Sequence, residues 1–522
     1  MRSKGPNIKL ILSLIAVFIS ASIPKSSATD VSGDVWGEWT AAGNPYNVIG
    51  DLRVPPGSTL VIGPGCYIEF QGYYRFLVDA SAVLQAIGTE IDSIIFTTAD
   101  STVTWDGFQF SYADTGSQLS YCRLERGHGA GHNDGGAIQC NGSYLELRNS
   151  FITENIGSFG SAIHLQPDNY IIVENNLFVA NRGYSVIYSV GNEYIKIAGN
   201  TFTGNDSTTI IETADRNDAM SITENIFHHN IYCGIVEIDG GGITIENNVI
   251  YDNLGVMFIS WQGSGPTLFR RNIIYGNYCP WSWAGGIFLT EDSYFIVENN
   301  TICNNSGVYR SYLGMILEEH GINGPVIFKN NIIWGNYYTN PEDSLILIDP
   351  DINFSQTYSD IQGGWGDMGN IMTDPIFVDT ANGDFHLMPG SPCIDTGDPA
   401  SPLDPDSTRA DMGALYFDQT TGINLPPPLP REITLYQNYP NPFNAQTAIS
   451  FNLPYGTEVL IEVYDMLGRR VAVLADEYYS AGSREITWDG KPANGDGLSS
   501  GIYFYRLQAG DFDKTNKMLL LK

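Results

Sequence analysis

NSFITEN, at residues 149–155, is the first of eight copies of one seven-residue phrase in this chain. The other copies are NNLFVAN (175–181), GNTFTGN (199–205), ENIFHHN (224–230), NNVIYDN (247–253), RNIIYGN (271–277), NNTICNN (299–305) and NNIIWGN (330–336). The closing asparagines of successive copies lie 23 to 31 residues apart. A recurrence of this length indicates stacked structural repeats rather than one globular core.

Each copy alternates as a β-strand does. An asparagine, or Ser150 in the first copy, stands five residues before the closing asparagine, and Ile or Phe stands three before it. These positions share one face of a strand, because side chains repeat every two residues. A further apolar run follows each copy, such as AIHL (162–165), VIYS (186–189), IIET (210–213) and IVEI (235–238). Three short strands per repeat with asparagine at the corners predict an all-β parallel β-helix of about twelve coils.

The charge balance narrows the choice of partners. The chain has 522 residues and a net charge of −32, and residues 30–431 carry 14 basic against 47 acidic side chains, a net of −33. So acidic a body argues against nucleic acid as a partner and is compatible with divalent cations such as calcium.

The first residues predict a signal peptide. Arg2, Lys4 and Lys9 come before the apolar run LILSLIAVFIS (10–20), and small residues allow cleavage after Ala28. The apolar run is too short to span a bilayer, so we expect no transmembrane segment. Residues 1–28 are therefore interpreted as a signal peptide that takes the chain out of the cytoplasm.

The flanks of the repeats resemble a known superfamily. The stretch at 37–70, WDGFQF (105–110), DPIFVDTANGDFHLMPGSPCIDTGDP (374–399) and RADMGALYF (409–417) are similar to the ends of secreted right-handed parallel β-helix proteins of the pectin-lyase-like fold. The resemblance implies one β-helix passenger with an amino-terminal cap over residues 30–417. It implies no single activity, because this superfamily includes lyases, hydrolases and adhesins.

The carboxy-terminal part has a different character. A proline-rich linker (418–431) is followed by YPNPFN (439–444), VLIEVYDMLGRRV (459–471), SSGIYFYRL (500–507) and KMLLLK (517–522). In order and position these motifs resemble the type A carboxy-terminal sorting domain of the type IX secretion system, an Ig-like β-sandwich over residues 432–522. The resemblance implies the secretion machinery as a partner and export across the outer membrane of a Gram-negative bacterium, to the cell surface or beyond. An ordinary Ig-like adhesion module is the alternative.

The resemblance also identifies the residues that carry the sorting signal. They are Pro440, Asn441, Pro442, Phe443, Gly468, Arg469, Lys517 and Lys522. We expect the exported protein to be a monomer.

The third strand of each repeat predicts an outward stripe of chemistry. If Ile163, Ile187, Ile211 and Val236 point inward, then Gln139, His164, Tyr188, Glu212 and Glu237 point outward in line, with Asn141, Gln166, Asp239 and Trp261 two places further along. The backbones of Glu212 and Glu237 should then lie roughly 5 Å apart. A slip of one residue in register would turn all of these side chains over.

Two functional interpretations follow from this stripe. Glu212 and Glu237 could act as acid and nucleophile on a glycosidic bond, with no cofactor. Alternatively, these carboxylates with Asp239, Asp215 and Asp218 could hold calcium against an acidic sugar. His164, Tyr188 and Trp261 would contact the sugar in either case, and the plainest alternative is a solvated acidic face.

The sequence thus favours an exported glycan-binding or structural surface protein, with a polysaccharide hydrolase or lyase as the alternative. A lyase also needs a basic group to remove a proton, and the stripe contains no Lys or Arg. A separate stretch, GHGAGHNDGG (127–136), brings His128, His132 and Asp134 to a spacing that permits a metal site.

Overall fold

The computed structural model describes most of the chain between residues 28 and 520. The described residues are 28–129, 135–192, 194–214, 219–231, 234–239, 242–255, 258–261, 267–279, 288–291, 295–307, 316–318, 325–338, 353–419, 433–438, 441, 443–444, 446–454, 457–466, 468–479, 482–491, 498–510 and 512–520. They form two compact units, one built mainly of residues 24–377 and 385–417 and the other mainly of residues 418–522. The predicted signal peptide lies outside the described residues, except for Ala28.

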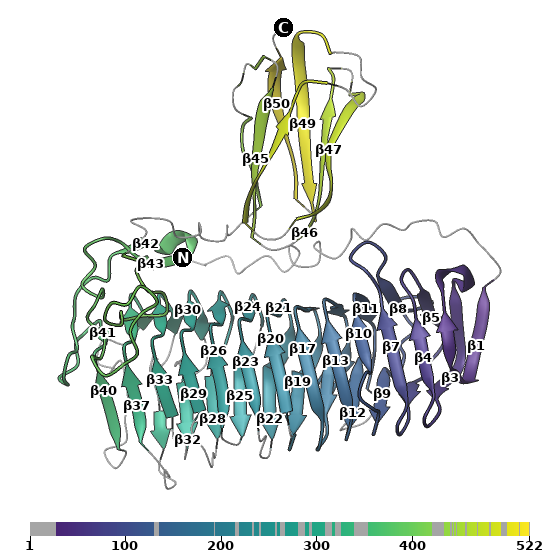
Figure 1. Ribbon diagram of the computed structural model, residues 1–522, viewed down its shortest axis with the longest axis horizontal. Helices are drawn as coiled ribbons and strands as arrows, with labels where there is room; N and C mark the ends of the chain where they lie inside the picture. The colour runs from purple at the N-terminus through teal and green to yellow at the C-terminus, as the bar shows by residue number, and fades with distance from the viewer. Residues whose placement is uncertain are drawn as a thin grey trace, which may run out of the picture. The chain divides into compact units, whose positions relative to one another are not determined.

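The larger unit is a parallel β-helix, as the repeats predict. One of its sheets has thirteen described strands that pair in chain order, and Figure 1 shows most of them side by side. These strands are β2 (Gly37–Trp39), β4 (Thr59–Ile62), β7 (Val83–Ile87), β10 (Gln118–Ser120), β13 (Tyr144–Arg148), β17 (Tyr170–Glu174), β20 (Tyr194–Ala198), β23 (Met220–Thr223), β26 (Ile243–Glu246), β29 (Thr267–Arg270), β33 (Phe295–Glu298), β37 (Val326–Lys329) and β40 (Phe354–Thr357).

The second sheet contains two further rows of parallel strands. The seven-residue phrase lies in the row β1 (Thr29–Asp34), β3 (Tyr46–Val54), β5 (Tyr67–Phe70), β8 (Ile94–Thr98), β11 (Cys122–Glu125), β14 (Phe151–Thr153), β18 (Leu177–Val179), β21 (Thr201–Thr203), β24 (Ile226–His228), β27 (Val249–Tyr251), β30 (Ile273–Tyr275), β34 (Thr301–Cys303), β38 (Ile332–Trp334) and β41 (Asp360–Ile361). The other row is β6 (Phe76–Val78), β9 (Phe108–Ser111), β12 (Ile138–Asn141), β16 (Ile163–Leu165), β19 (Arg182–Val190), β22 (Asp206–Ala214), β25 (Gly234–Asp239), β28 (Phe258–Trp261), β32 (Phe288–Glu291) and β36 (Ile316–Glu318). Short elements complete the unit: β15 (Ile156–Gly157), β31 (Tyr278–Cys279), β35 (Ser306–Gly307), β39 (Tyr337–Tyr338), β42 (Phe377–Asp379), β43 (Asp384–Leu387) and the single turns Ala41–Gly43 and Thr380–Asn382.

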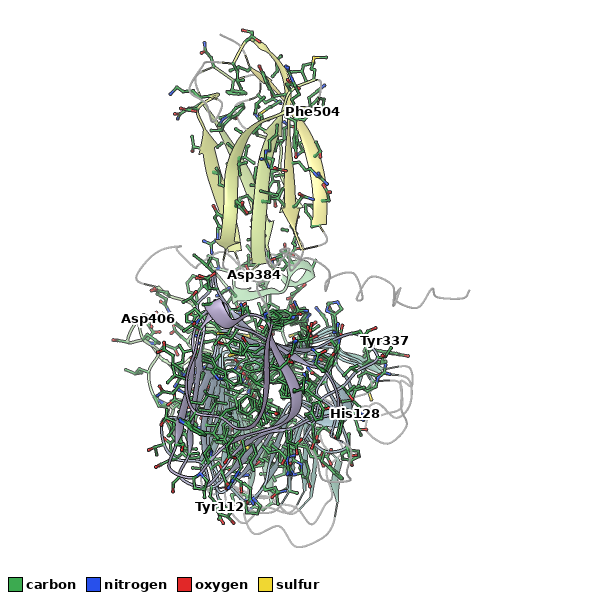
Figure 2. All side chains as sticks on the ribbon, turned by 90° about the vertical axis from the view of Figure 1, so that its right-hand side faces the viewer. Tyr112, His128, Tyr337, Asp384, Asp406 and Phe504 are labelled. Atoms are coloured by element: carbon green, nitrogen blue, oxygen red, sulfur yellow. The ribbon has the colours of Figure 1, made fainter. Side chains whose placement is uncertain are left out.

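The inward face of every row forms a continuous apolar core. Figure 2, which looks along the stacked coils, shows side chains filling their interior. Identical residues stack on one another: the rings of Phe178 and Phe202 lie 4.6 Å apart, and those of Phe202 and Phe227 lie 4.9 Å apart. Burial of such ladders supplies the main stabilisation, because no single coil can bury its own apolar face.

Asparagine ladders close two corners of each coil. The amide of Asn200 donates to the carbonyl of Val173 at 2.9 Å and to Oδ1 of Asn225 at 3.0 Å, while its own Oδ1 accepts from the backbone N–H of Asn176 at 2.9 Å. The residue before each ladder position has a left-handed backbone, for example Asn175 with φ 56° and Glu224 with φ 58°. Each corner is therefore a tight turn whose buried backbone groups are satisfied by the amide stack.

The segment after the last coil folds back over the outer surface of earlier coils. Phe385, Leu387, Cys393 and Met412 are buried against outward residues that include Tyr275. Hydrogen bonds fix the segment: the Gly413 N–H donates to the Asn330 carbonyl at 2.7 Å, and the Ala414 N–H donates to the Thr301 hydroxyl at 2.9 Å. The closing segment thus covers the side of the helix as well as following its last strands.

Cysteines of the larger unit are core residues. Cys66, Cys122, Cys140, Cys303 and Cys393 are buried thiols. Burial raises the pKa of Cys66 to about 11, which makes its thiolate scarce at neutral pH.

The carboxy-terminal unit contains two small antiparallel sheets around its own core. One sheet is β44 (Thr434–Leu435), β45 (Thr447–Leu453) and β48 (Gly482–Trp488), and the other is β47 (Arg470–Tyr479), β46 (Thr457–Tyr464), β49 (Gly501–Ala509) and β50 (Phe512–Leu520). Alternate residues of both sheets, including Phe451, Ile461, Tyr505 and Met518, form one buried cluster. This arrangement fits the predicted small β-sandwich.

Several residues of the predicted sorting signal hold the last strand in this unit. The side chain of Asn441 accepts from the Leu519 N–H at 2.9 Å and donates to the Lys517 carbonyl at 3.3 Å. Phe443 is buried beside them, whereas Gly468 and Arg469 form a turn in which the Arg469 side chain pairs with Asp465 at 2.7 Å. Pro440, Pro442 and Lys522 lie outside the described residues.

Candidate functional site

The structure places the predicted stripe in the expected order. Gln139 pairs with His164, His164 with Tyr188, Tyr188 with Glu212, and Glu212 with Glu237 in successive parallel strands from β12 to β25. Their neighbours on either side, such as Ile211 and Thr213 around Glu212, are buried. Tyr188, Glu212 and Glu237 are partly exposed, so the register in which this face points outward is the one the structure adopts.

The strands that carry the stripe bend just before it. In β19 the consecutive residues Ser185, Val186 and Ile187 are all buried, while Tyr184 and Tyr188 on either side of them are exposed or partly exposed. The pairing of β19 with β22 omits Tyr184 and Val186 but keeps one register throughout, so both strands bend together at this point. Because the alternation is interrupted, outward residues on both sides of the bend can face the same space.

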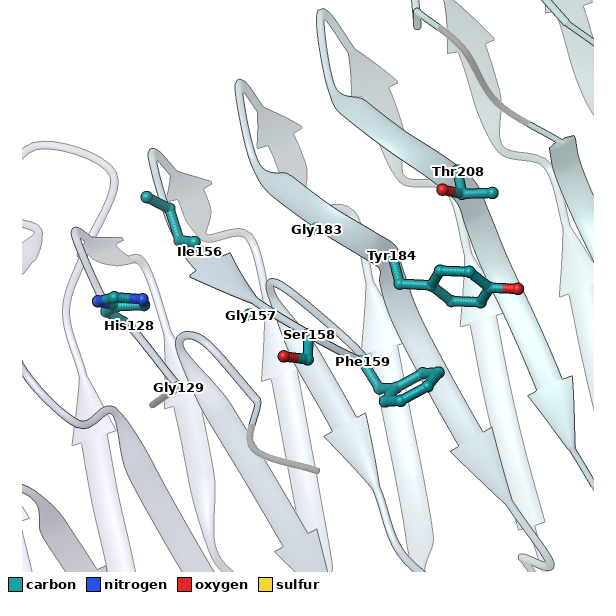
Figure 3. A pocket seen from close by; sticks show the side chains of 9 residues that line it. All are labelled: His128, Gly129, Ile156, Gly157, Ser158, Phe159, Gly183, Tyr184 and Thr208. Atoms are coloured by element: carbon teal, nitrogen blue, oxygen red, sulfur yellow. The ribbon is translucent and has the colours of Figure 1, made fainter. Parts of the chain in front are cut away.

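An aromatic cluster occupies this bend. The Phe159 ring lies 4.8 Å from the Tyr188 ring and 5.2 Å from the Tyr184 ring, as centroid distances. Figure 3 shows Phe159 and Tyr184 side by side at one end of an open hollow whose volume is about 470 Å³. His128, Ile156, Ser158 and Thr208 line other parts of it.

The two carboxylates lie next to this cluster. Burial first, and then the negative charges that Glu212 and Glu237 carry at alkaline pH, raise the pKa of the Tyr184 phenol, so both carboxyl groups lie near the rim of the hollow. Each carboxylate is held by a hydroxyl of the preceding coil: Ser185 hydrogen bonds to Glu212, and Thr209 Oγ1 donates to Glu237 Oε2 at 3.0 Å. The bend residues therefore orient the carboxylates.

Glu212 has a strongly raised pKa. Burial, followed by the charge of Glu237, raises the pKa of Glu212 to about 8, although the hydrogen bond from Ser185 acts in the opposite direction. Its Oε2 atom is inaccessible to solvent and has no hydrogen-bond partner within the described part of the chain. At neutral pH Glu212 is thus mainly a neutral acid that can donate a proton.

His164 lies on the stripe but not on the surface. Only 3% of its side chain is exposed, and its ring packs edge-on to Tyr188 with the centroids 5.3 Å apart. The prediction that His164 points outward into solvent is therefore wrong: its ring packs against Tyr188, and a Cβ on Gly135 would come within 2.9 Å of the His164 Cβ. His164 supports Tyr188 instead.

For the remaining predicted site residues, the structure describes no side chain that reaches the aromatic cluster or the two glutamates. Asp239 pairs with Trp261 through the backbones of β25 and β28, two positions beyond the pair of Glu237 and Ile259. Their side chains, and all of Asp215, Asp218, His132 and Asp134, lie outside what the structure describes. Among the described residues, no three His, Cys, Asp or Glu side chains are arranged to hold a metal ion.

Phe159, Tyr184, Ser185 and Thr209 were missed by reasoning from the sequence. Their signal is a small residue two positions before the inward apolar residue, in FGSAI (159–163), YSVI (184–187) and TTII (208–211). A strand read as strictly alternating hides this signal, because the bend places three buried residues in succession.

Comparison with known proteins agrees with this architecture. Residues 79–264 and 208–349 match the family model described as the right handed beta helix region, and together they make up more than half of the chain. The chain belongs to the right-handed β-helix family. Residues 437–521 of this β-helix protein match the secretion system C-terminal sorting domain.

Two individual proteins are similar to the β-helix protein. Uncharacterized protein YwoF of Bacillus subtilis (strain 168) is 27% identical over 212 residues, which are 40% of this chain and 39% of YwoF. The chain thus matches well under half of the length of that relative. The crystal structure of pectate lyase Pel9A aligns with 70% of this chain and 88% of its own, with a TM-score of 0.40 and 15% identity.

The sorting domain decides where the β-helix protein acts. It directs the chain to the type IX secretion machinery and so to the cell surface or the extracellular space. The described residues include no helix of the length and apolarity that a membrane span requires.

Proposed function

We propose that the β-helix protein is a polysaccharide-binding protein of the cell surface or extracellular medium, with its site at the bend between β16 and β25. One observation carries the proposal: Phe159 and Tyr184 line an open hollow, the Tyr188 ring packs against Phe159, and the carboxyl groups of Glu212 and Glu237 act on Tyr184. Aromatic faces pack on the apolar faces of sugar rings, and carboxylates accept hydrogen bonds from sugar hydroxyls.

The repeat supports a polymeric ligand rather than a single sugar. Successive coils rise by roughly 4.8 Å, which is about the length of one pyranose unit in an extended chain. The aromatic residues and the carboxylates lie on neighbouring coils, so a glycan along the helix axis would meet them one after another. Affinity should therefore increase with chain length up to about four sugar units, one for each coil from β16 to β25.

Binding to a panel of polysaccharides in affinity gel electrophoresis tests this proposal. Tyr184→Ala should lose most of the retardation in the gel. Tyr170→Ala is the matched control, because Tyr170 is similarly exposed, at 41% against 43% for Tyr184, and also packs against aromatic rings, but on the outer face of the thirteen-stranded sheet. The proposal would be contradicted if both variants were retarded equally, or if no polysaccharide retarded the wild-type protein.

Glycoside hydrolysis is the second candidate. It is favoured by the pair itself, since a neutral Glu212 with a pKa of about 8 stands beside the charged Glu237 on adjacent strands. A retaining glycosidase needs an acid and a nucleophile about 5 Å apart. Release of reducing ends that disappears in Glu212→Gln and persists in Glu224→Gln would support hydrolysis, and Glu224 is a suitable control because it is exposed in a turn of the same coil.

A further inference from the structure

The charges around the aromatic cluster affect which classes of glycan can bind beside it. This question rests on the proposed function, because it concerns the ligand of the same site. The residues that line the hollow include no Lys or Arg, and the carboxylate of Glu237 acts on its rim at Tyr184, whereas Glu212 is mainly neutral at neutral pH. Arg182 lies on the same strand as Tyr184, and its guanidinium forms an ion pair with the Asp206 carboxylate at 3.2 Å. The site therefore offers no uncompensated positive charge among the described residues.

From this arrangement we infer that the bend selects neutral polysaccharides and rejects chains of uronic acids. A uronate polymer carries one negative charge on every sugar. Along this face its charges would be repelled by the Glu237 carboxylate and would find no positive side chain to pair with among the described residues. The surrounding body of the protein adds to the repulsion, since residues 30–431 have a net charge of −33. A neutral glycan meets no such cost and can still donate hydroxyl hydrogen bonds to Glu237.

A calcium bridge would be the ordinary way for an acidic polymer to bind an acidic groove. It would require at least three suitable ligands close together, and the described residues form no such group. Asp215, Asp218 and the side chain of Asp239 lie outside the described residues, so the test is made both with calcium and with a chelator.

The test compares the full chain on a neutral polymer, unsubstituted xylan, and on polygalacturonate, by isothermal titration at low and high salt, with calcium and with a chelator. Xylan should bind at least about tenfold more tightly than polygalacturonate at 20 mM salt, because one repelling pair in a partly exposed site accounts for about tenfold. At 0.5 M salt the ratio should fall to about threefold or less, since screening removes the repulsion.

A charge-neutral variant sharpens the result. In Glu237→Gln the ratio of xylan affinity to polygalacturonate affinity should fall about tenfold relative to the wild type, because the repelling charge is removed while any hydrogen bond to residue 237 changes for both polymers alike. Glu224→Gln removes the same charge at an exposed turn away from the hollow and should leave the ratio unchanged.

The outcomes separate the two proposals. Polygalacturonate bound as tightly as xylan, or bound only with calcium, overturns the neutral selectivity while glycan binding stands. Chitosan bound more tightly than xylan also overturns it, because the site would then select cations. If Tyr184→Ala binds every polymer as well as the wild type does, the bend is not the glycan site and the proposed function itself fails.

Discussion

The asparagine corners and the bend belong to the same coils, but the corners repeat one side chain from coil to coil whereas the bend repeats only the backbone. At the corners one residue type is kept from coil to coil, and Asn176, Asn200 and Asn225 form the same hydrogen bonds in turn. At the bend the backbone is kept, with a small buried residue such as Ser161, Ser185 or Thr209 in each coil, but the outward side chain changes from His164 to Tyr188 to Glu212. A solenoid can thus hold its architecture at one edge and vary its chemistry at another.

The largest effect should come from breaking one corner. Asn225 is fully buried; its Oδ1 accepts from the backbone and side chain of Asn200, and its amide donates to Ile197 and Asn248. Asn225→Ala removes the partners of the Asn200 N–H and the Ile197 carbonyl in the preceding coil and one donor to the Asn248 side chain in the next. We expect the free energy of unfolding of the β-helix to fall by about 2–5 kcal/mol, measured by chemical denaturation of the full chain with far-UV circular dichroism.

Thr201→Ala is the control for this corner. Thr201 lies in β21 beside the ladder but is partly exposed, so its loss should cost less than about 0.5 kcal/mol. Similar losses for the two variants would show that the ladder adds nothing beyond ordinary strand packing.

A smaller effect is expected at the bend, and it should depend on pH. The folded pKa of Glu212 is about 8, above its value of about 4.3 in an unfolded chain. A raised carboxyl pKa means that the folded state holds the proton more tightly, so this contribution to stability is complete below about pH 4.3 and is lost as pH rises through about 8. Glu212→Gln should gain about 1–2 kcal/mol over the wild type between pH 4 and pH 9, once solvent screening is allowed for.

The measurement is the difference between the two unfolding free energies across that pH range. Glu224→Gln, at an exposed turn, should show a flat difference. A flat difference for Glu212→Gln as well would mean that the carboxyl is ordinarily solvated, and the bend would then lose its electrostatic distinction from the corners.

The smallest effect concerns the turn residue before each ladder asparagine. These residues have a positive φ, which suits Gly and Asn but strains Glu224, at φ 58°. Glu224→Gly should therefore stabilise the β-helix by up to about 1 kcal/mol, read as a higher thermal midpoint. Thr201→Gly, at an extended strand position, should instead lower the midpoint; a fall in both variants would show that the turn is not strained.

Much of the architecture follows from the repeat alone. The phrase around Asn176, Asn200 and Asn225 predicts the corners and the inward ladder of Phe178, Phe202 and Phe227, because stacking identical coils leaves one register that buries the apolar residues. Separately, the sorting domain is recognisable because its motifs are local in sequence, and the match at residues 437–521 confirms it.

Other features depend on contacts between residues that are far apart in the sequence. Phe385 and Met412 read as parts of a terminal segment, yet they cover Tyr275, more than a hundred residues earlier. His164 shares the outward parity of Tyr188 and is nevertheless buried, since its ring packs against Tyr188 and Gly135 of the preceding coil lies close to its Cβ. Alternation specifies the face of a strand on which a residue lies, not what covers that face.

The sequence by itself thus determined the stacked coils, their asparagine corners, the order of Tyr188, Glu212 and Glu237 along one stripe, and the route of export. Only the tertiary structure decided that Phe159 and Tyr184 join this stripe and that Glu212 keeps its proton near neutral pH. The physical reason is that period and register are properties of the repeating pattern, whereas a bend in the strand, a buried ring and a raised pKa depend on the packing and charge that neighbouring coils create around one residue.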